Sequence, residues 1–390
     1  MKDKSYGKMC AEDFCIDEDM IWFVPININL LCGYSISDKS ITKRIEIPSV
    51  TLKKERAFQK IVKVDKYIIG IPYVADYYFK YNKETEEIAF LKYPWINNTN
   101  TCPYLSLSVV YDNCVISFRR FLEYAKEEAN RVVLFDYEKM ELESCWIKED
   151  FDFDYYGSHG VAFRTIGVVE NEKLITLQGE ISRIIEFDLN KKDIKFNMLP
   201  QENVLIETIS KIGKDLFCIS DRKGSLWIWN RDSNSFKKIE NRVIGFSNVY
   251  SDEDCFIGSV CIDNKVYFFP YFSNMILEYD IDNDILQEAF FSKEIVDNSY
   301  SAKMNILGCE NTQFSYPHLC NNKIIVWNLW NKKCYEIDTE NKMVNQIDMT
   351  VQFSTDEMKN IFAKDFKEGC VSENGRTVFS ELNHLIEYLI

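Results

Sequence analysis

Apolar runs separated by polar turns repeat along this chain. Residues 263–287, DNKVYFFPYFSNMILEYDIDNDILQ, align without a gap on residues 321–345, NNKIIVWNLWNKKCYEIDTENKMVN. Both copies read as a polar turn, an apolar run, a short break, a second apolar run that ends in Asp, another polar turn and a third run. Runs rich in Val, Ile, Phe, Tyr and Trp between Asn, Asp and Lys are typical of short antiparallel strands. The repeat therefore predicts a unit of three strands joined by a loop and a turn.

The same spacing marks further copies of the unit. In each copy a "closing residue" ends the first apolar run, and a "turn residue" of type Asp, Asn or Ser stands ten positions later, after a large apolar side chain. The pairs are Pro25 and Ser35, Pro72 and Asn82, Gln178 and Asp188, Ser220 and Asn230, Pro270 and Asp280, and Asn328 and Asp338. A seventh copy has Arg119 as its closing residue and Asp136 as its turn residue, after a longer loop. Successive turn residues are 42 to 58 residues apart, which is typical of propeller blades with insertions.

An additional apolar run precedes the first polar turn of every copy and supplies a fourth strand. These runs are residues 9–16, 57–64, 105–110, 164–169, 206–212, 256–262 and 313–319. A four-stranded sheet with two apolar faces must be covered on both sides, and stacking the copies in a ring also removes exposed sheet edges. We therefore expect an all-β fold, a seven-bladed β-propeller of four-stranded antiparallel blades over residues 1–350. The expected blades are residues 9–48, 57–94, 104–147, 161–199, 204–240, 255–292 and 312–349.

Residues 351–390 depart from the repeat. Residues 355–367, TDEMKNIFAKDFK, are amphipathic and begin after residues suited to cap a helix. In the final segment, one helical face would carry Val378, Leu382, Leu385, Ile386 and Leu389. We expect a short C-terminal helical tail that packs on the propeller. Because residues 370–375, CVSENG, resemble a strand entering a polar turn, residues 368–390 could instead belong to an extra blade, and eight or six blades stay open as alternatives.

Charge restricts the class of partner. The chain has 61 Asp and Glu against 46 Lys and Arg, a formal net charge of −15. A surface of this charge repels phosphate backbones, so we expect no nucleic acid partner. No apolar run reaches membrane-spanning length, and the first residues lack the apolar core of a signal peptide. We therefore expect no membrane partner and a cytoplasmic location.

Cysteine usage favours the same compartment. The 13 cysteines are an odd number without a close Cys-x-x-Cys pair, and Cys114, Cys218, Cys261 and Cys334 lie within strand-like runs. Buried thiols in a reducing compartment are a better interpretation than a disulfide framework. We expect no cofactor, and a monomer.

The repeated units resemble blades of kelch and related-repeat β-propellers, in which a strand ending in Tyr-Asp or a similar pair leads into the outer strand. The pairs that carry this resemblance are Tyr279-Asp280, Phe135-Asp136, Phe187-Asp188 and Tyr81-Asn82. The paired glycines of kelch blades do not occur among the 14 Gly of this chain. Trp229-Asn230 and Trp327-Asn328 are similar to the Trp-Asp of WD repeats, without the Gly-His partner. The resemblance implies a fold and does not fix a function.

Ligand binding is expected on one face of the propeller. The loops that join second to third strands, and fourth strands to the next first strand, lie on that face around the central channel. Residues at or just after the closing positions would line this rim: Asn27, Tyr73, Asp76, Arg119, Arg120, Gln178, Glu180, Asp221, Arg222, Tyr271, Asn328 and Trp330. Mixed charges and aromatic rings suit a peptide or a sugar. We expect a protein or peptide partner, with carbohydrate as the second choice.

Metal binding has one weak candidate. Asp150, Asp152 and Asp154 alternate along the chain and would share one face of a strand. An EF-hand loop needs Gly at its sixth position and Glu at its twelfth, where this chain has Tyr155 and Val161. An acidic loop with exposed aromatic rings is the better interpretation, and no metal is expected.

Catalysis receives little support from the sequence. His159, His318 and His384 are far apart, and no nucleophile, phosphate-loop or zinc motif occurs. Glu180 and Asp221 could act as a carboxylate pair from adjacent blades, although such pairs arise by chance among 61 acids. We assign no catalytic residue. The favoured hypothesis is a non-enzymatic interaction module, and the alternative is a sugar- or peptide-processing hydrolase or lyase with its site in the central channel.

Overall fold

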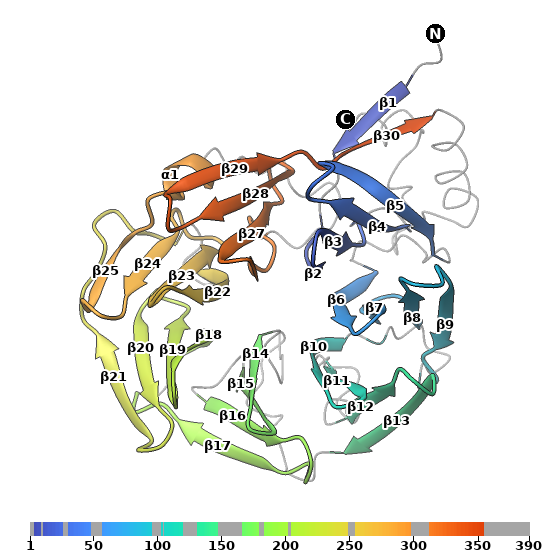
Figure 1. Cartoon of the computed structure of the whole chain (residues 1–390). Coiled ribbons are helices and arrows are strands. Elements are labelled where there is room, and N and C mark those ends of the chain that lie inside the picture. Colours follow the sequence, from blue (N-terminus) through green and yellow to red (C-terminus); the bar gives the residue numbers. More distant parts are fainter. Residues whose placement is uncertain are drawn as a thin grey trace, which may run out of the picture. The chain divides into compact units, whose positions relative to one another are not determined.

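The computed structural model describes residues 4–8, 11–25, 30–47, 57–95, 103, 105–119, 131–146, 166–178, 183–201, 204–248, 254–297 and 312–354. Within these ranges the chain forms seven four-stranded antiparallel sheets, one two-stranded sheet and one short helix (Figure 1). This is the expected seven-bladed β-propeller, and each sheet lies inside the corresponding expected stretch of sequence. The chain divides into two compact units, residues 103–296 and the residues on either side of them.

The first unit contains blades 1, 2 and 7. Blade 1 consists of β2 (Phe14–Asp17), β3 (Met20–Phe23), β4 (Leu30–Ser35) and β5 (Ser40–Glu46). Blade 2 consists of β6 (Phe58–Val64), β7 (Tyr67–Pro72), β8 (Tyr77–Asn82) and β9 (Ile88–Lys92). Blade 7 consists of β26 (His318–Cys320), β27 (Lys323–Asn328), β28 (Lys333–Asp338) and β29 (Met343–Ile347).

The second unit contains blades 3 to 6. Blade 3 consists of β10 (Leu105–Tyr111), β11 (Cys114–Arg119), β12 (Arg131–Asp136) and β13 (Glu141–Trp146). Blade 4 consists of β14 (Gly167–Glu170), β15 (Lys173–Gln178), β16 (Arg183–Asp188) and β17 (Ile194–Met198). Blade 5 consists of β18 (Ile206–Gly213), β19 (Leu216–Asp221), β20 (Leu226–Asn230) and β21 (Ser235–Ile239). Blade 6 consists of β22 (Phe256–Ile262), β23 (Lys265–Pro270), β24 (Leu277–Asp280) and β25 (Ile285–Glu288), followed by α1 (Ser292–Ile295).

A two-stranded sheet joins the two ends of the described chain. The strand β1 (Lys4–Lys8) pairs antiparallel with β30 (Thr350–Ser354), a pairing that the sequence did not suggest. Strand β30 takes up the first residues of the segment 351–390 that we expected to form a helical tail. Residues 355–390 lie outside the described part of the chain.

The middle strands of the blades are covered on both faces. Every residue of β7 is buried, and β19 is buried except at its first residue. The fourth strands are different, because β5 alternates between exposed and partly buried positions, as does β21 up to its buried last residue, Ile239. A strand that is apolar on both faces must lie between two covering layers, whereas an alternating strand faces water on one side. Each blade therefore needs a neighbour to cover its middle strands.

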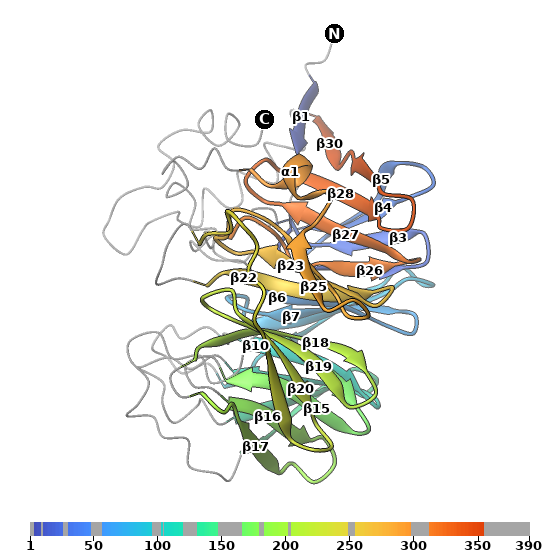
Figure 2. The same cartoon turned by 90° about the vertical axis from the view of Figure 1, so that its left-hand side faces the viewer.

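Neighbouring blades supply these covering side chains. One cluster joins Ile175 and Leu177 of blade 4 to Phe217 and Trp229 of blade 5, and these two blades lie side by side in both views (Figures 1 and 2). Trp229 has no exposed surface. Burying a large side chain stabilises a fold by about 1.5–3 kcal/mol. Packing between neighbouring blades therefore makes a substantial contribution to stability.

Buried carboxylates add polar contacts between blades. Glu207 on β18 accepts hydrogen bonds from the backbone N–H groups of Cys255 (2.8 Å) and Phe256 (3.0 Å) at the start of blade 6. In the other unit, Asp13 beside β2 accepts from the N–H of Ile61 on β6 (3.1 Å) and lies 2.9 Å from Nε2 of His318 on β26. His318 therefore has the structural hydrogen bond that its strand position favours.

The turn residues have one structural role in all seven blades. Each accepts a hydrogen bond from a backbone N–H two or three residues later, as Asp280 does from Asn283 (3.0 Å) and Asp338 from Asn341 (2.8 Å). The fourth residue after each turn residue has a left-handed backbone, with φ between 49° and 64°, and none of the seven is Gly. Side chains that bond their own turn explain why Asp, Asn and Ser recur at this spacing.

Cysteines in the described part of the chain serve as packing residues. Nine of them carry free thiols. Burial raises the pKa of the Cys32 thiol to about 12 and raises the pKa of the Cys218 thiol further still. These thiols are therefore protonated and poorly nucleophilic at neutral pH.

Replacing the left-handed residue of a turn by glycine should stabilise the protein. Lys342 has φ 53° and is exposed, so Lys342→Gly removes the clash of a Cβ atom with its own backbone and should raise the free energy of unfolding by about 1 kcal/mol. Urea denaturation measures the change. Lys342→Ala is the control, because it removes the same charge and keeps the Cβ. Equal stability of the two variants would contradict the assignment of strain.

Stability in acid should depend on Glu186. This buried carboxylate accepts hydrogen bonds from Asn197 (2.8 Å) and from Arg231 of the next blade (2.9 and 3.0 Å). Burial by itself raises the pKa of Glu186, but the bonds from Asn197 and Arg231 outweigh it, so the net pKa is lowered. A lowered folded-state pKa gives stability that is present above the unfolded-state pKa and lost as pH falls through the folded-state pKa.

Glu186→Gln should therefore lower the free energy of unfolding by about 1.5–3 kcal/mol at pH 7, because the partly buried Arg231 loses the nearer of its two ionised partners and keeps only Glu170, at 3.7 Å. The loss should shrink as the pH is lowered toward the folded-state pKa. Denaturant titrations across the acid range measure this, with the exposed Glu340→Gln as control. A loss that is independent of pH would contradict the account.

Candidate functional site

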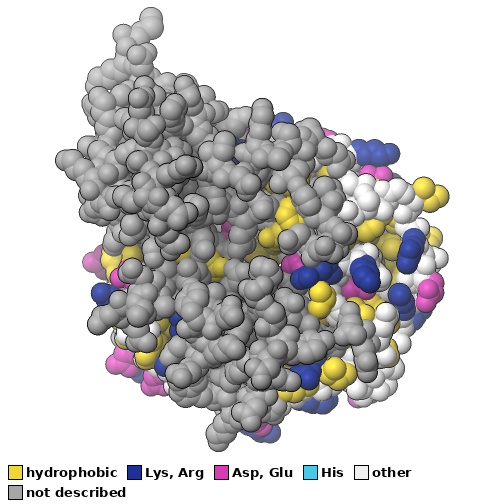
Figure 3. Space-filling model, turned by 180° about the vertical axis from the view of Figure 1, so that it is seen from behind, with side chains coloured by type: hydrophobic (Ala, Val, Ile, Leu, Met, Phe, Trp, Pro, Cys, Tyr) yellow, Lys and Arg dark blue, Asp and Glu magenta, His cyan; other side chains and the backbone are white. Residues whose placement is uncertain are grey.

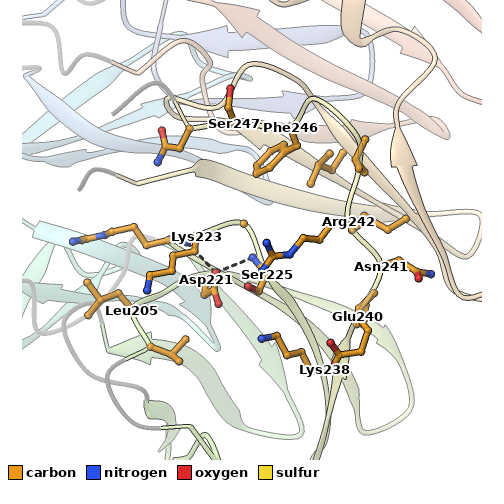
Figure 4. Close-up of a pocket in the computed structure, with 18 of the residues that line it drawn as sticks. Leu205, Asp221, Lys223, Ser225, Lys238, Glu240, Asn241, Arg242, Phe246 and Ser247 are labelled. Atoms are coloured by element: carbon orange, nitrogen blue, oxygen red, sulfur yellow. Dashed lines mark hydrogen bonds between the residues drawn. The ribbon is translucent and has the colours of Figure 1, made fainter. Parts of the chain in front are cut away.

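A cavity of about 740 Å³ lies between blades 5 and 6 (Figure 4). Its walls come from the turn between β19 and β20 (residues 221–225), from residues 240–248 after β21, and from residues 204–205 before β18. All three segments are connections of the two kinds that we expected to carry a ligand site. Leu277 and Leu286 of blade 6 close the cavity on its apolar side. The cavity is therefore on the predicted face, but beside one blade interface.

The turn of residues 221–225 is built by its own sequence, Asp-Arg-Lys-Gly-Ser. Oδ1 of the buried Asp221 accepts hydrogen bonds from the N–H groups of Lys223 (2.9 Å) and Ser225 (2.8 Å). Gly224 has φ +74°, a backbone conformation that residues with a Cβ rarely adopt. A Cβ on Gly224 would lie 2.4 Å from the ring of Phe246. Glycine therefore lets the turn pack directly against the facing segment.

Residues 241–248 are held in place from blade 6. Asn274, in the connection between β23 and β24, accepts from the N–H of Ser247 (2.9 Å) and donates to the carbonyl of Gly245 (2.8 Å). The ring of Phe246 also stacks on Phe256, with centroids 5.8 Å apart and planes at 25°. Next to these anchored residues, Ile244 is 99% exposed. The segment thus presents one aliphatic side chain to solvent from a fixed backbone.

The described walls of the cavity carry more positive than negative side chains, whereas the whole chain has a net negative charge. Arg222, Lys223, Lys238 and Arg242 line it together with the acids Asp221 and Glu240. Figure 3 shows Lys and Arg side chains beside hydrophobic ones on the described part of this face, over blades 5 and 6. A cavity lined by more cations than anions raises the local concentration of anionic ligands.

Two of these four cations are already engaged. Arg222 lies 3.0 Å from Oδ1 of Asp254 through both Nε and Nη2, and Lys238 lies over the ring of Trp227 at 5.2 Å. Lys223 and Arg242 have no side-chain hydrogen bond or ion pair with any residue that the structure describes. Arg242 extends toward the turn that carries Ser225 (Figure 4). These two side chains come from different segments of the cavity wall, the turn of residues 221–225 and residues 240–248, and are free to meet a ligand.

The structure brings together only part of the predicted rim. Asp221 and Arg222 line the cavity. Five predicted residues lie at strand ends or next to them with at most 5% exposure: Tyr73, Arg119, Gln178, Asp221 and Asn328. Asp76 carries a weak exposed ion pair with Lys92, and Tyr271 and Trp330 are only partly exposed. Asn27, Arg120 and Glu180 lie outside the described residues, as do Asp150, Asp152 and Asp154, so the pairing of Glu180 with Asp221 stays a prediction.

The sequence analysis missed Lys223, Arg242, Ile244 and Phe246. Three of these lie in the connection after a fourth strand, a kind of connection that we expected on the ligand face but from which we predicted no site residue here. The signal was the short apolar run Val-Ile-Gly-Phe, residues 243–246, between polar residues on both sides. Among the described residues, no His, Cys, Asp and Glu side chains gather in a group of three that could hold a metal ion. None of the helices described there is long and apolar enough to cross a membrane.

Solved structures share this fold at low sequence identity. Virginiamycin B lyase from Staphylococcus aureus superimposes with a TM-score of 0.56 and 10% identity over 84% of this chain and 96% of that chain. The computationally designed Ika8 protein gives a TM-score of 0.53 and 8% identity over 88% of each chain. The extracellular domain of a hybrid two component system from B. thetaiotaomicron gives 0.52 and 12% over 89% of this chain and 39% of that chain.

No protein-family model matches the chain, and neither does any curated protein sequence. At such identities the likeness to the solved structures shows the β-propeller fold alone. The function must therefore be argued from the cavity itself.

Two glycines beside the cavity provide a matched test of its packing. Gly224→Ala should lower the free energy of unfolding by about 2–5 kcal/mol, because a left-handed backbone costs about 1–2 kcal/mol and overpacking against Phe246 adds about 1–3 kcal/mol. Gly245→Ala has the same backbone strain, with φ +83°, but its Cβ would meet nothing within 4 Å. Its free energy of unfolding should therefore fall only by the cost of the left-handed backbone, as measured by chemical denaturation. Equal losses would show that Phe246 does not press on this turn.

Proposed function

We propose that this protein is an interaction module that binds a protein or peptide on the face of the propeller that carries the blade 5–6 cavity. One observation carries the proposal: Ile244 is 99% exposed on a backbone that Asn274 and Phe246 hold in place beside the cavity. An exposed aliphatic side chain on a fixed backbone loses little entropy when a partner covers it, so it makes an efficient binding contact.

The cavity supports the same proposal through its size. Ligand pockets have volumes of roughly 300–1,000 Å³, and the 740 Å³ of this cavity fall within that range. A peptide that covers Ile244 would place neighbouring side chains in the cavity. Apolar and charged groups are mixed in its walls, as they are at many protein interfaces.

The chemistry of the cavity favours binding over catalysis. The acids in its described walls are Asp221 and Glu240. Oδ1 of Asp221 already accepts two backbone hydrogen bonds that hold the turn together, and Glu240 is exposed. A general acid and base acting together would need two titratable groups aimed at one substrate atom. The hydrolase or lyase hypothesis is therefore kept as the alternative that the experiment must exclude.

The proposal includes a cytoplasmic location and a relationship to kelch-type repeats. Free thiols at the nine described cysteines are compatible with a reducing compartment. In each of the four kelch-like pairs, the Asp or Asn accepts a hydrogen bond from the backbone of its own turn. This local role explains the residue type without common ancestry, so the proposed relationship rests on the resemblance alone.

Peptide display on the full-length protein tests the proposal. A random-peptide library should yield sequences that bind the wild-type protein and bind Ile244→Asp at least about tenfold more weakly, since a buried aliphatic contact is replaced by a charge. Ile285→Asp, on the fourth strand of blade 6 and 47% exposed, is the matched control and should bind as the wild type does.

Two results would overturn this function. The first is that no displayed peptide binds better to the wild type than to Ile244→Asp. The second is that neutral oligosaccharides raise the melting temperature and are cleaved by the wild-type protein, which would establish the enzymatic alternative.

A further inference from the structure

We propose that the blade 5–6 cavity recognises an acidic residue of the bound peptide, with the carboxylate between Lys223 and Arg242. This inference rests on the proposed function and specifies the chemistry of the partner: a segment that carries Asp or Glu next to an aliphatic residue. The carboxylate would enter the cavity, and the aliphatic side chain would cover Ile244.

The two cations are suited to this role by their position and their lack of partners. Lys223 lies on the turn whose backbone Asp221 and Gly224 fix, and Arg242 lies in the segment of residues 240–248, whose Phe246 faces Gly224 of that turn. Neither side chain forms a hydrogen bond or ion pair within the described residues. Arg242 offers a planar fork of donors that matches a carboxylate, and Lys223 adds a second charge. By contrast, the guanidinium of Arg222 is already bound to Asp254.

The net charge of −15 does not oppose this binding at physiological salt. The Debye length is then about 8 Å, so acids on distant blades are screened from a ligand in the cavity. Only charges near the ligand matter. Among the described residues there, Asp254 neutralises Arg222, and Lys223, Lys238 and Arg242 remain against Asp221 and Glu240. The exposed Glu240 at the edge of the cavity disfavours a densely charged polyanion. The balance therefore favours one or two carboxylates over a nucleic acid.

The aromatic ring of the cavity argues for a peptide over an acidic carbohydrate. Sugars commonly stack on an exposed aromatic face. Phe246 is the one aromatic residue among the described lining residues, and its ring is taken up by contacts with Gly224 and Phe256. Ile244 adds an aliphatic contact that suits an apolar side chain better than a hydroxylated ring. The apolar and cationic groups together fit an acidic-aliphatic peptide.

Fluorescence anisotropy with designed peptides tests the inference. The probe is a fluorescein-labelled peptide of Glu, Leu and Ser residues, compared with copies in which Gln or Lys replaces every Glu. The wild-type protein should bind the Glu peptide at least about tenfold more tightly than the Gln copy. Raising the salt concentration should lower the affinity for the Glu peptide and leave the affinity for the Gln copy unchanged. The double variant Lys223→Glu with Arg242→Glu should lose this preference.

The control must change the net charge equally. Lys39→Glu with Lys214→Glu alters two exposed lysines, one in the β4–β5 turn and the other in the β18–β19 turn, away from the cavity walls. It should bind the Glu peptide within about twofold of wild type, since distant charges are screened. Thermal melts of both double variants establish that each one folds.

The outcomes separate this inference from the proposed function. Equal binding of the Glu and Gln peptides, or unchanged binding by the Lys223→Glu, Arg242→Glu variant, overturns the acidic specificity. If display-selected neutral peptides still depend on Ile244, the interaction module stands and only the anion inference fails. If polygalacturonate displaces the Glu peptide and Ile244→Asp has no effect on either ligand, the site belongs to an acidic carbohydrate and the inference is overturned.

Discussion

The structure depends on one constraint: the middle strands of each blade are largely buried on both faces. Strand β7 is buried along its whole length, and β19 nearly so. A single four-stranded sheet cannot keep both faces dry, so a blade is stable only between neighbours. Within each unit, the apolar clusters therefore run from one blade to the next, as between blades 4 and 5. Glu207 and Asp13 add directional bonds across blade boundaries, which fix the register of packing.

Because the strands of the blades pack rigidly against one another, the segments that connect the strands are the parts left to bind a partner. The blade 5–6 cavity illustrates how a connection can be fixed without being part of a strand. Asn274 holds residues 241–248 through two hydrogen bonds, and Gly224 allows Phe246 to rest against the facing turn. These contacts leave Ile244, Lys223 and Arg242 without partners among the described residues. The cavity thus combines a fixed frame with side chains that the fold itself does not use.

Turn chemistry made the architecture predictable. The turn residues recur because each one bonds the backbone of its own turn, a local interaction that fixes residue type and spacing together. The cavity was harder to predict. The side chains at closing positions such as Gln178 and Asn328 are buried, and sequence periodicity alone could not tell which loop residues stay exposed. The path of residues 241–248 depends on Asn274, a contact across 29 positions from Gly245 that no local pattern indicates.

Hydrogen exchange of the full-length protein with and without the Glu, Leu and Ser peptide tests the central claim, that the blade 5–6 cavity is the recognition site. The account predicts slower exchange of the backbone amides in residues 221–225 and 241–248 when the peptide is bound, because both walls of the cavity become covered. The corresponding connection in blade 7, at Asn328 and Trp330, should be unchanged. Protection confined to blade 7, with none at the cavity, would contradict the account.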